Sequence, residues 1–124
     1  MPEPKRILAV LEDLFFTVKI NESAKQAGVG ISFVKSEFDV LEQAKLQPKL
    51  IIMDLGFQGV DMLKLIRTLK ADELTRRINL IGYLSHVQGE LKLQAQEAGC
   101  DMVLPRSAFS QNLPQILKRH SGSS

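Results

Sequence analysis

Two patterns of apolar residues alternate along the chain. Short, nearly continuous apolar runs are typical of strands buried on both faces, and apolar residues recurring every three or four positions are typical of amphipathic helices. Strands are predicted at residues 7–11, 31–34, 50–53, 78–84 and 102–104. Each is followed by a helical pattern, at residues 16–27, 38–46, 62–69, 91–98 and 113–117. The chain is therefore expected to contain five consecutive strand–helix units.

This alternation determines the expected architecture. Consecutive strands joined by a helix must run parallel, because every connection is a crossover. Right-handed crossovers distribute the helices over both faces of the sheet. The predicted fold class is α/β: a doubly wound, five-stranded parallel sheet in a three-layer sandwich. Gly82, inside the fourth strand, indicates a place where a neighbour packs closely against the backbone or where the strand bends.

Composition narrows the class of protein. The chain has 124 residues, which suits one domain over residues 1–120 with a flexible tail at 121–124. Its net charge of +2 is too small to favour nucleic acid as a partner. No apolar run approaches the ~20 residues needed to cross a bilayer, and Cys100, the only cysteine, cannot form an intrachain disulfide. We expect a cytoplasmic domain that binds neither nucleic acid nor membrane.

The candidate chemistry lies where the strands end. The carboxyl ends of parallel strands share one edge of a sheet, and ligands of open α/β sheets bind there. That edge is expected to collect Glu12, Asp13, Asp54, Ser85 and Arg106. Carboxylates crowded around one crevice repel each other unless a cation neutralises them, and Mg²⁺ suits such oxygen ligands. A site for Mg²⁺ on Glu12, Asp13 and Asp54 is therefore predicted, with phosphoryl transfer onto Asp54 as the matching chemistry. The structural alternative is that Asp54 only caps the following helix.

Three segments carry a resemblance to a known family. Residues 54–61, 74–81 and 98–101 resemble the phosphoacceptor loop, the approach to the fourth strand and the segment before the fifth strand in receiver domains of bacterial two-component response regulators. The resemblance covers roughly residues 5–119 and is to receivers of the single-domain kind seen in chemotaxis. It implies a flavodoxin-like fold with strand order 2-1-3-4-5. It also implies a phosphorylated signalling protein rather than an enzyme, with a sensor histidine kinase or another signalling protein as its partner.

The resemblance assigns roles to the residues that follow the later strands. Asp54 falls on the phosphoacceptor aspartate, and Arg106 falls on the lysine that stabilises the phosphoryl group. Leu84 falls on the threonine or serine whose hydroxyl binds that group, so Ser85, one place later, is a candidate substitute hydroxyl. Losing a charge-assisted hydrogen bond of this kind costs about 1.5–3 kcal/mol.

The metal-binding acidic pair of the family is also altered here. It aligns with Leu11 and Glu12, or with Glu12 and Asp13 if the chain bulges by one residue. In the first alignment Leu11 replaces one acid, which leaves fewer ligands and implies weak binding of Mg²⁺. The leading hypothesis is an atypical receiver in a phosphorelay, with output through protein–protein contact and a homodimer through the fourth helix, fifth strand and fifth helix.

Two alternatives stay open at this point. The chain could be a pseudo-receiver that binds partners without phosphorylation, or a small flavodoxin-like nucleotide-binding protein. The second is disfavoured because the first strand–helix turn has no glycine-rich phosphate loop. Tyr83 is predicted to pack near the fourth helix, the alternative being a displaced aromatic switch, and His86 is predicted to be a solvated loop residue.

Overall fold

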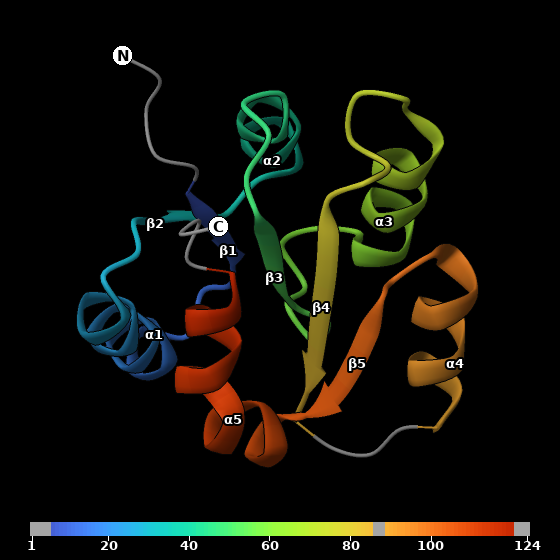
Figure 1. Cartoon of the computed structure of the whole chain (residues 1–124). Helices are drawn as coiled ribbons and strands as arrows, with labels where there is room; N and C mark the ends of the chain where they lie inside the picture. The colour runs from blue at the N-terminus through green and yellow to red at the C-terminus, as the bar shows by residue number, and fades with distance from the viewer. Residues whose placement is uncertain (1–5, 86–88, 121–124) are drawn as a thin grey trace.

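The computed structural model describes residues 6–85 and 89–120, so His86 and the predicted tail lie outside the described residues. Strands and helices alternate along the whole described chain (Figure 1). The elements are β1 (Ile7–Val10), α1 (Leu14–Ala27), β2 (Ile31–Val34), α2 (Glu37–Ala44), β3 (Leu50–Asp54), α3 (Met62–Ala71), β4 (Asn79–Leu84), α4 (Gly89–Ala98), β5 (Met102–Pro105) and α5 (Arg106–Arg119). Within the described residues, no helix is long and apolar enough to span a membrane.

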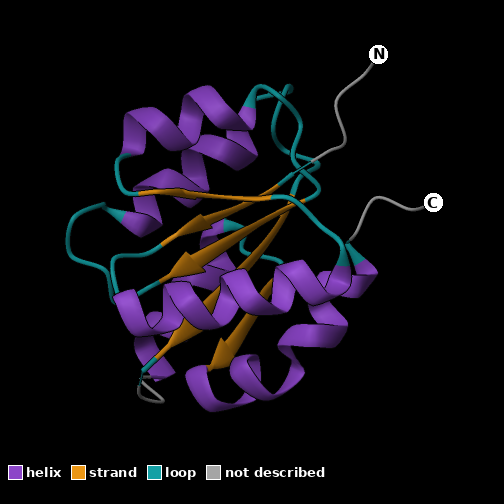
Figure 2. Cartoon of the chain, turned by 90° about the vertical axis from the view of Figure 1, so that its left-hand side faces the viewer, coloured by secondary structure: helices purple, strands orange, loops and turns teal. Residues whose placement is uncertain are grey.

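The five strands form one parallel sheet in the order β2-β1-β3-β4-β5. Helices lie on both sides of it, as Figure 2 shows. Buried residues of α1 and α5 form one cluster with one face of the sheet, and buried residues of α2, α3 and α4 form a second cluster with the other face. The predicted fold class and strand order are both confirmed.

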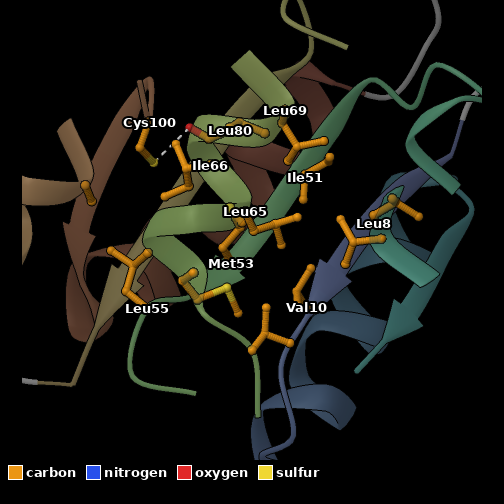
Figure 3. Packing of buried hydrophobic residues seen from close by; sticks show 14 of the residues in the cluster. Leu8, Val10, Ile51, Met53, Leu55, Leu65, Ile66, Leu69, Leu80 and Cys100 are labelled. Carbon is orange, nitrogen blue, oxygen red and sulfur yellow. Dashed lines mark hydrogen bonds between the residues drawn. The ribbon is translucent and has the colours of Figure 1, made fainter. Parts of the chain in front are cut away.

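The central strand β3 shows why the apolar run is continuous. Leu50 and Ile52 belong to the cluster with α1 and α5, whereas Ile51 and Met53 belong to the cluster with α2, α3 and α4. Figure 3 shows Ile51 and Met53 beside apolar side chains of α3. All four side chains are fully buried. Because both faces of the strand are covered, alternation with polar residues is lost, and only the last residue, Asp54, reaches the edge.

Gly82 has the close contact that its position in β4 predicted. A Cβ atom placed on Gly82 would lie 2.8 Å from Cδ1 of Leu55, which is inside the normal contact distance. The backbone N–H of Leu55 also donates to the carbonyl oxygen of Tyr83 at 3.0 Å. Since Leu55 directly follows Asp54, the missing side chain of Gly82 lets β3 continue against β4 where the acidic residue is placed.

At the amino ends of β4 and β5, opposite the edge with Asp54, one lysine joins several segments by hydrogen bonds. The Nζ atom of Lys70 donates to the carbonyl oxygens of Arg76 and Ile78, and to Oδ2 of Asp101, each at 3.0 Å. The same Oδ2 accepts the backbone N–H of Leu80 at 2.8 Å. This Lys70 network joins the end of α3 to the starts of β4 and β5, far along the strands from Asp54.

Helix α5 is longer than the sequence pattern predicted. It begins at Arg106 rather than near Leu113, and it continues through Pro114 to Arg119. Its buried positions include Phe109 and Leu113, four residues apart, so the apolar stripe does extend toward the first turn. The longer helix places Arg106 in its first turn, directly after β5.

Candidate functional site

Asp54 is the last residue of β3 and lies at the carboxyl edge of the sheet. Its Oδ1 atom accepts the backbone N–H of Gly56 at 2.9 Å. The next helix, α3, is capped by a different residue, because Oδ1 of Asp61 accepts the backbone N–H of Lys64 at 3.1 Å. The alternative in which Asp54 caps that helix is therefore wrong, and the half-buried carboxyl group is left available for chemistry.

Two large buried residues flank Asp54 across the sheet. Tyr83 of β4 is its register partner, and Leu11, which follows the paired residues Val10 and Met53, continues the register on the side of β1. Leu11 and Tyr83 are each 1% exposed. Burial raises the pKa of Asp54, the hydrogen bond from Gly56 and the positive charge of Arg106 oppose this rise, and the charge of Asp13 adds to it.

Asp13 uses both carboxylate oxygens in other contacts. Its Oδ1 atom caps α1 by accepting the backbone N–H groups of Phe15 at 2.9 Å and Phe16 at 3.2 Å. Its Oδ2 atom accepts from the guanidinium of Arg106 at 2.6 Å. The bond from the Phe16 N–H lowers the pKa of Asp13, burial opposes it, and the bond from Arg106 lowers the pKa further. We call this contact between α1 and α5 the Asp13–Arg106 bridge.

Arg106 is further held by an aromatic ring. Its Cζ atom lies 4.6 Å from the centroid of Phe16, a distance typical of a cation–π contact. Its charge still acts on Asp54, but its hydrogen bond goes to Asp13. The predicted residues Asp13, Asp54 and Arg106 are thus brought together at one edge, with the cation held by the neighbouring carboxylate.

The other predicted site residues lie less favourably. Glu12 and Ser85 are exposed. Leu84 is 5% exposed and belongs to the apolar cluster with α2, α3 and α4. Leu84 therefore contributes to the core, and a role for Ser85 as the substitute hydroxyl stays a prediction.

The residues at this edge do not fit a preformed magnesium site. Among residues 6–85 and 89–120, no three His, Cys, Asp or Glu side chains are grouped so that they could hold a metal ion. Glu12, Asp13 and Asp54, the three predicted ligands, accordingly do not form such a group. The physical reason is that Leu11 occupies the position beside Asp54 in the sheet, while Asp13 is already bonded to Arg106.

Tyr83 was placed on the wrong side of the sheet by the sequence-based prediction. It does pack in the core, but against Phe109 of α5, with ring centroids 5.0 Å apart and an angle of 13° between the rings, and against Phe16 of α1 at 4.9 Å. Side chains alternate along a strand, so the face that receives Leu84 cannot also receive Tyr83. This alternation was the available signal that Tyr83 and Leu84 lie on opposite faces, and the register with β3 places Tyr83 on the face of Asp54.

No protein-family model matches the chain, and no curated protein matches its sequence. Solved structures do match its fold. A response regulator from Hahella chejuensis has a TM-score of 0.83 and 18% identity, over 94% of each chain. The receiver domain of a sensor histidine kinase from Pseudomonas aeruginosa, solved with magnesium in its active-site cleft, has a TM-score of 0.79 and 24% identity, covering 98% of this chain and 100% of that one.

A chemotaxis response regulator of Vibrio cholerae gives a similar result. Its TM-score is 0.79 at 14% identity, and the match covers 95% of this chain and 99% of that chain. These similarities extend over nearly the full length of both partners in each comparison. The chain therefore has the fold of response regulator receiver domains.

Proposed function

We propose that this chain is an atypical receiver domain of two-component signalling, in which Asp54 accepts a phosphoryl group with low efficiency. The observation that carries the proposal is the position of Asp54. Its carboxyl group ends the central strand of a receiver fold, is half-buried, does not cap α3, and lies within the electrostatic influence of Arg106. A carboxylate in such a position is a competent nucleophile for phosphoryl transfer.

The chemistry is a direct displacement at phosphorus. A carboxylate oxygen of Asp54 forms a bond to the phosphorus atom of a donor, and the donor's bond to phosphorus breaks. That bond is P–N for a phosphohistidine and P–O for an acyl phosphate, and the leaving group retains the electron pair. Arg106 is the cation placed to stabilise the phosphoryl oxygens, as positively charged groups do in such transfers, once it leaves Asp13.

Low efficiency follows from the surroundings of Asp54. Leu84 supplies no hydroxyl, and the Asp13–Arg106 bridge withholds the cation from the acceptor. The same bridge favours a second candidate function. In that case the domain is a pseudo-receiver. The Asp13–Arg106 bridge takes the place of the contact that Arg106 would make with a phosphoryl group on Asp54, and partners bind the unmodified protein.

Two exposed apolar surfaces support output through protein–protein contact. Leu14, Phe15 and Val18 are 75%, 85% and 57% exposed on the first turns of α1, next to the bridge. Large exposed apolar groups in a cluster mark interaction surfaces. We assign this surface to a sensor histidine kinase or another signalling protein of the cytoplasm, with no enzymatic activity of the chain itself.

The second surface suits the proposed homodimer through α4, β5 and α5. Leu93 of α4 and Met102 of β5 are 55% and 42% exposed. A cavity of about 460 Å³ lies along β5 and α5, lined in part by Met102, Leu104 and Ile116. These apolar groups would be covered by a second copy of the chain.

The test is phosphorylation in solution. The protein is incubated with acetyl phosphate, with and without Mg²⁺, and its intact mass is measured beside Asp54→Asn and Asp61→Asn. The Asp61 variant is the matched control, because asparagine still caps α3. The expected result is one added phosphoryl group in the wild type and in Asp61→Asn but none in Asp54→Asn. No gain at any Mg²⁺ concentration would exclude the acceptor role and leave the pseudo-receiver.

A further inference from the structure

The hydroxyl group of Tyr83 is buried and has no hydrogen-bond partner. In the part of the chain that the structure describes, it is the only buried side-chain nitrogen or oxygen in this condition. Buried tyrosine hydroxyls normally find a partner, because removing such a group from water without compensation is unfavourable. A phenylalanine would pack in the same space without that cost, so the hydroxyl requires an explanation.

The unpaired hydroxyl lies in the neighbourhood of the candidate site. Tyr83 is the register partner of Asp54, and paired residues of parallel strands point to the same face of the sheet. The charges of Asp54, Arg106 and Asp13 all act on the phenol. Burial raises the pKa of Tyr83 far above its usual range, followed by the effect of the Asp54 charge, so the group stays protonated as a donor.

The aromatic neighbours of Tyr83 connect this hydroxyl to the bridge. Phe16 packs against Tyr83 on one side and carries the guanidinium of Arg106 on its ring. Phe109 of α5 stacks on Tyr83 and also contacts Phe16, with centroids 5.8 Å apart. Departure of Arg106 from Asp13 toward a group on Asp54 would remove the charged cover of Phe16, and the unpaired hydroxyl of Tyr83 would remain as a second donor on the face of Asp54.

We propose that the Tyr83 hydroxyl is a reserve donor to the anionic group formed on Asp54, in place of the hydroxyl missing at Leu84. This inference rests on the proposed function, because it needs an anion at Asp54. The contact would order the aromatic cluster of Phe16, Tyr83 and Phe109, and it would thereby transmit the state of Asp54 to α1 and α5.

The composition of the chain allows the state of Tyr83 to be followed by spectroscopy. Tyr83 is the only tyrosine, and the chain has no tryptophan. Tyrosine absorbance and emission therefore report this one side chain without labelling. A phenol that begins to donate to an anion changes both signals, so loading of Asp54 can be followed at Tyr83.

The experiment compares wild type, Tyr83→Phe and Ser85→Ala after loading with acetyl phosphate. Tyr83→Phe removes only the unpaired hydroxyl, so its unfolding midpoint is expected to be no lower than that of the wild type. The lifetime of its phosphoryl group, followed by intact mass, is expected to fall about tenfold, as for loss of one hydrogen bond to a charged group. Ser85→Ala removes the competing hydroxyl, so a lifetime that falls further in Tyr83→Phe than in Ser85→Ala assigns the contact to Tyr83.

The spectroscopic arm uses the tyrosine signal of the wild type and of Asp54→Asn. Loading is expected to change the Tyr83 signal in the wild type and not in Asp54→Asn. A wild type that accepts phosphate, together with a Tyr83→Phe variant of equal lifetime, overturns the inference while the proposed function stands. A shortened lifetime in Ser85→Ala alone also overturns it. A wild type that accepts no phosphate overturns both.

Discussion

Asp13 makes two kinds of interaction, a helix cap and an ion pair, and suitable substitutions remove them separately. One oxygen caps α1 through the N–H groups of Phe15 and Phe16, and the other binds Arg106. Replacing a capping aspartate with alanine costs about 1 kcal/mol. The bridge is partly exposed, with 38% and 34% of the two side chains accessible, so it contributes about 0–1 kcal/mol. Asp13→Ala is expected to lose both contributions, for a total of about 1–2 kcal/mol.

Asp13→Asn is the informative variant, because asparagine caps helices as well as aspartate does but carries no charge. It is expected to retain the cap and lose only the contribution of the charge pair. The two variants should therefore differ by about 1 kcal/mol, or about 4 °C in melting temperature for a domain of this size. Thermal unfolding followed by circular dichroism at neutral pH measures the difference, and high salt should reduce only the charge-pair part.

The acid dependence of the same variants provides a second check. The pKa of Asp13 is lowered from its usual value of 3.8, so the folded state favours the charged form. The stability that Asp13 contributes is then present above the unfolded-state pKa and is lost as the pH falls through the folded-state pKa. The stability of Asp13→Asn should not show this decrease below about pH 4. If Asp13→Asn melts as low as Asp13→Ala at neutral pH, the bridge rather than the cap holds this end of α1, and our reasoning is refuted.

Two further predictions concern the acceptor and its cation. Burial raises the pKa of Asp54, so its charged form destabilises the fold. Asp54→Asn should therefore unfold at higher denaturant concentration than the wild type at neutral pH. This difference in stability should disappear as the pH falls below 3.8, the usual pKa of an aspartate. Arg106→Gln removes a cation from beside Asp13 and Asp54, and calorimetry should show Mg²⁺ binding strengthened by about fivefold, from about 1 kcal/mol of relieved repulsion.

Each of these predictions has an opposite outcome that would count against it. An Asp54→Asn variant with wild-type stability at neutral pH would mean that burial does not penalise the carboxylate. Equal Mg²⁺ affinity in the wild type and in Arg106→Gln would mean that the bridge does not compete with the metal. Arg106→Lys serves as the control for the second prediction, since it retains the charge without the planar two-pronged geometry.

The strands were predictable because the signals that produce them are local, whereas their order was implied only by the resemblance to receiver domains. In β3, four apolar residues followed by Asp54 indicate burial on both faces and an exposed end, and the structure has both features. The start of α5 was not predictable in the same way. Between Arg106 and Leu113 only Phe109 lies on the buried stripe, which is too sparse to distinguish a helix from a loop.

The pairing within the site was beyond the reach of sequence patterns. Asp13 and Arg106 are 93 positions apart, and their contact depends on where α1 and α5 begin. Placing both residues at the carboxyl edge was sufficient to predict their proximity. It was insufficient to predict that Asp13, rather than Asp54, binds the guanidinium, because the capping role of Asp13 orients its second oxygen.

The Lys70 network has a consequence for how the molecule tolerates change. It joins α3, β4 and β5 through main-chain carbonyl groups and one carboxylate, at the end of the sheet opposite Asp54. Main-chain acceptors are present whatever the side chains of Arg76 and Ile78 are. The contacts that hold α3, β4 and β5 together therefore lie at the opposite end of the strands from Asp54, so residues around the acceptor can be exchanged while this network persists. Substitutions that make Asp54 a more active acceptor can therefore be introduced without disturbing the Lys70 network.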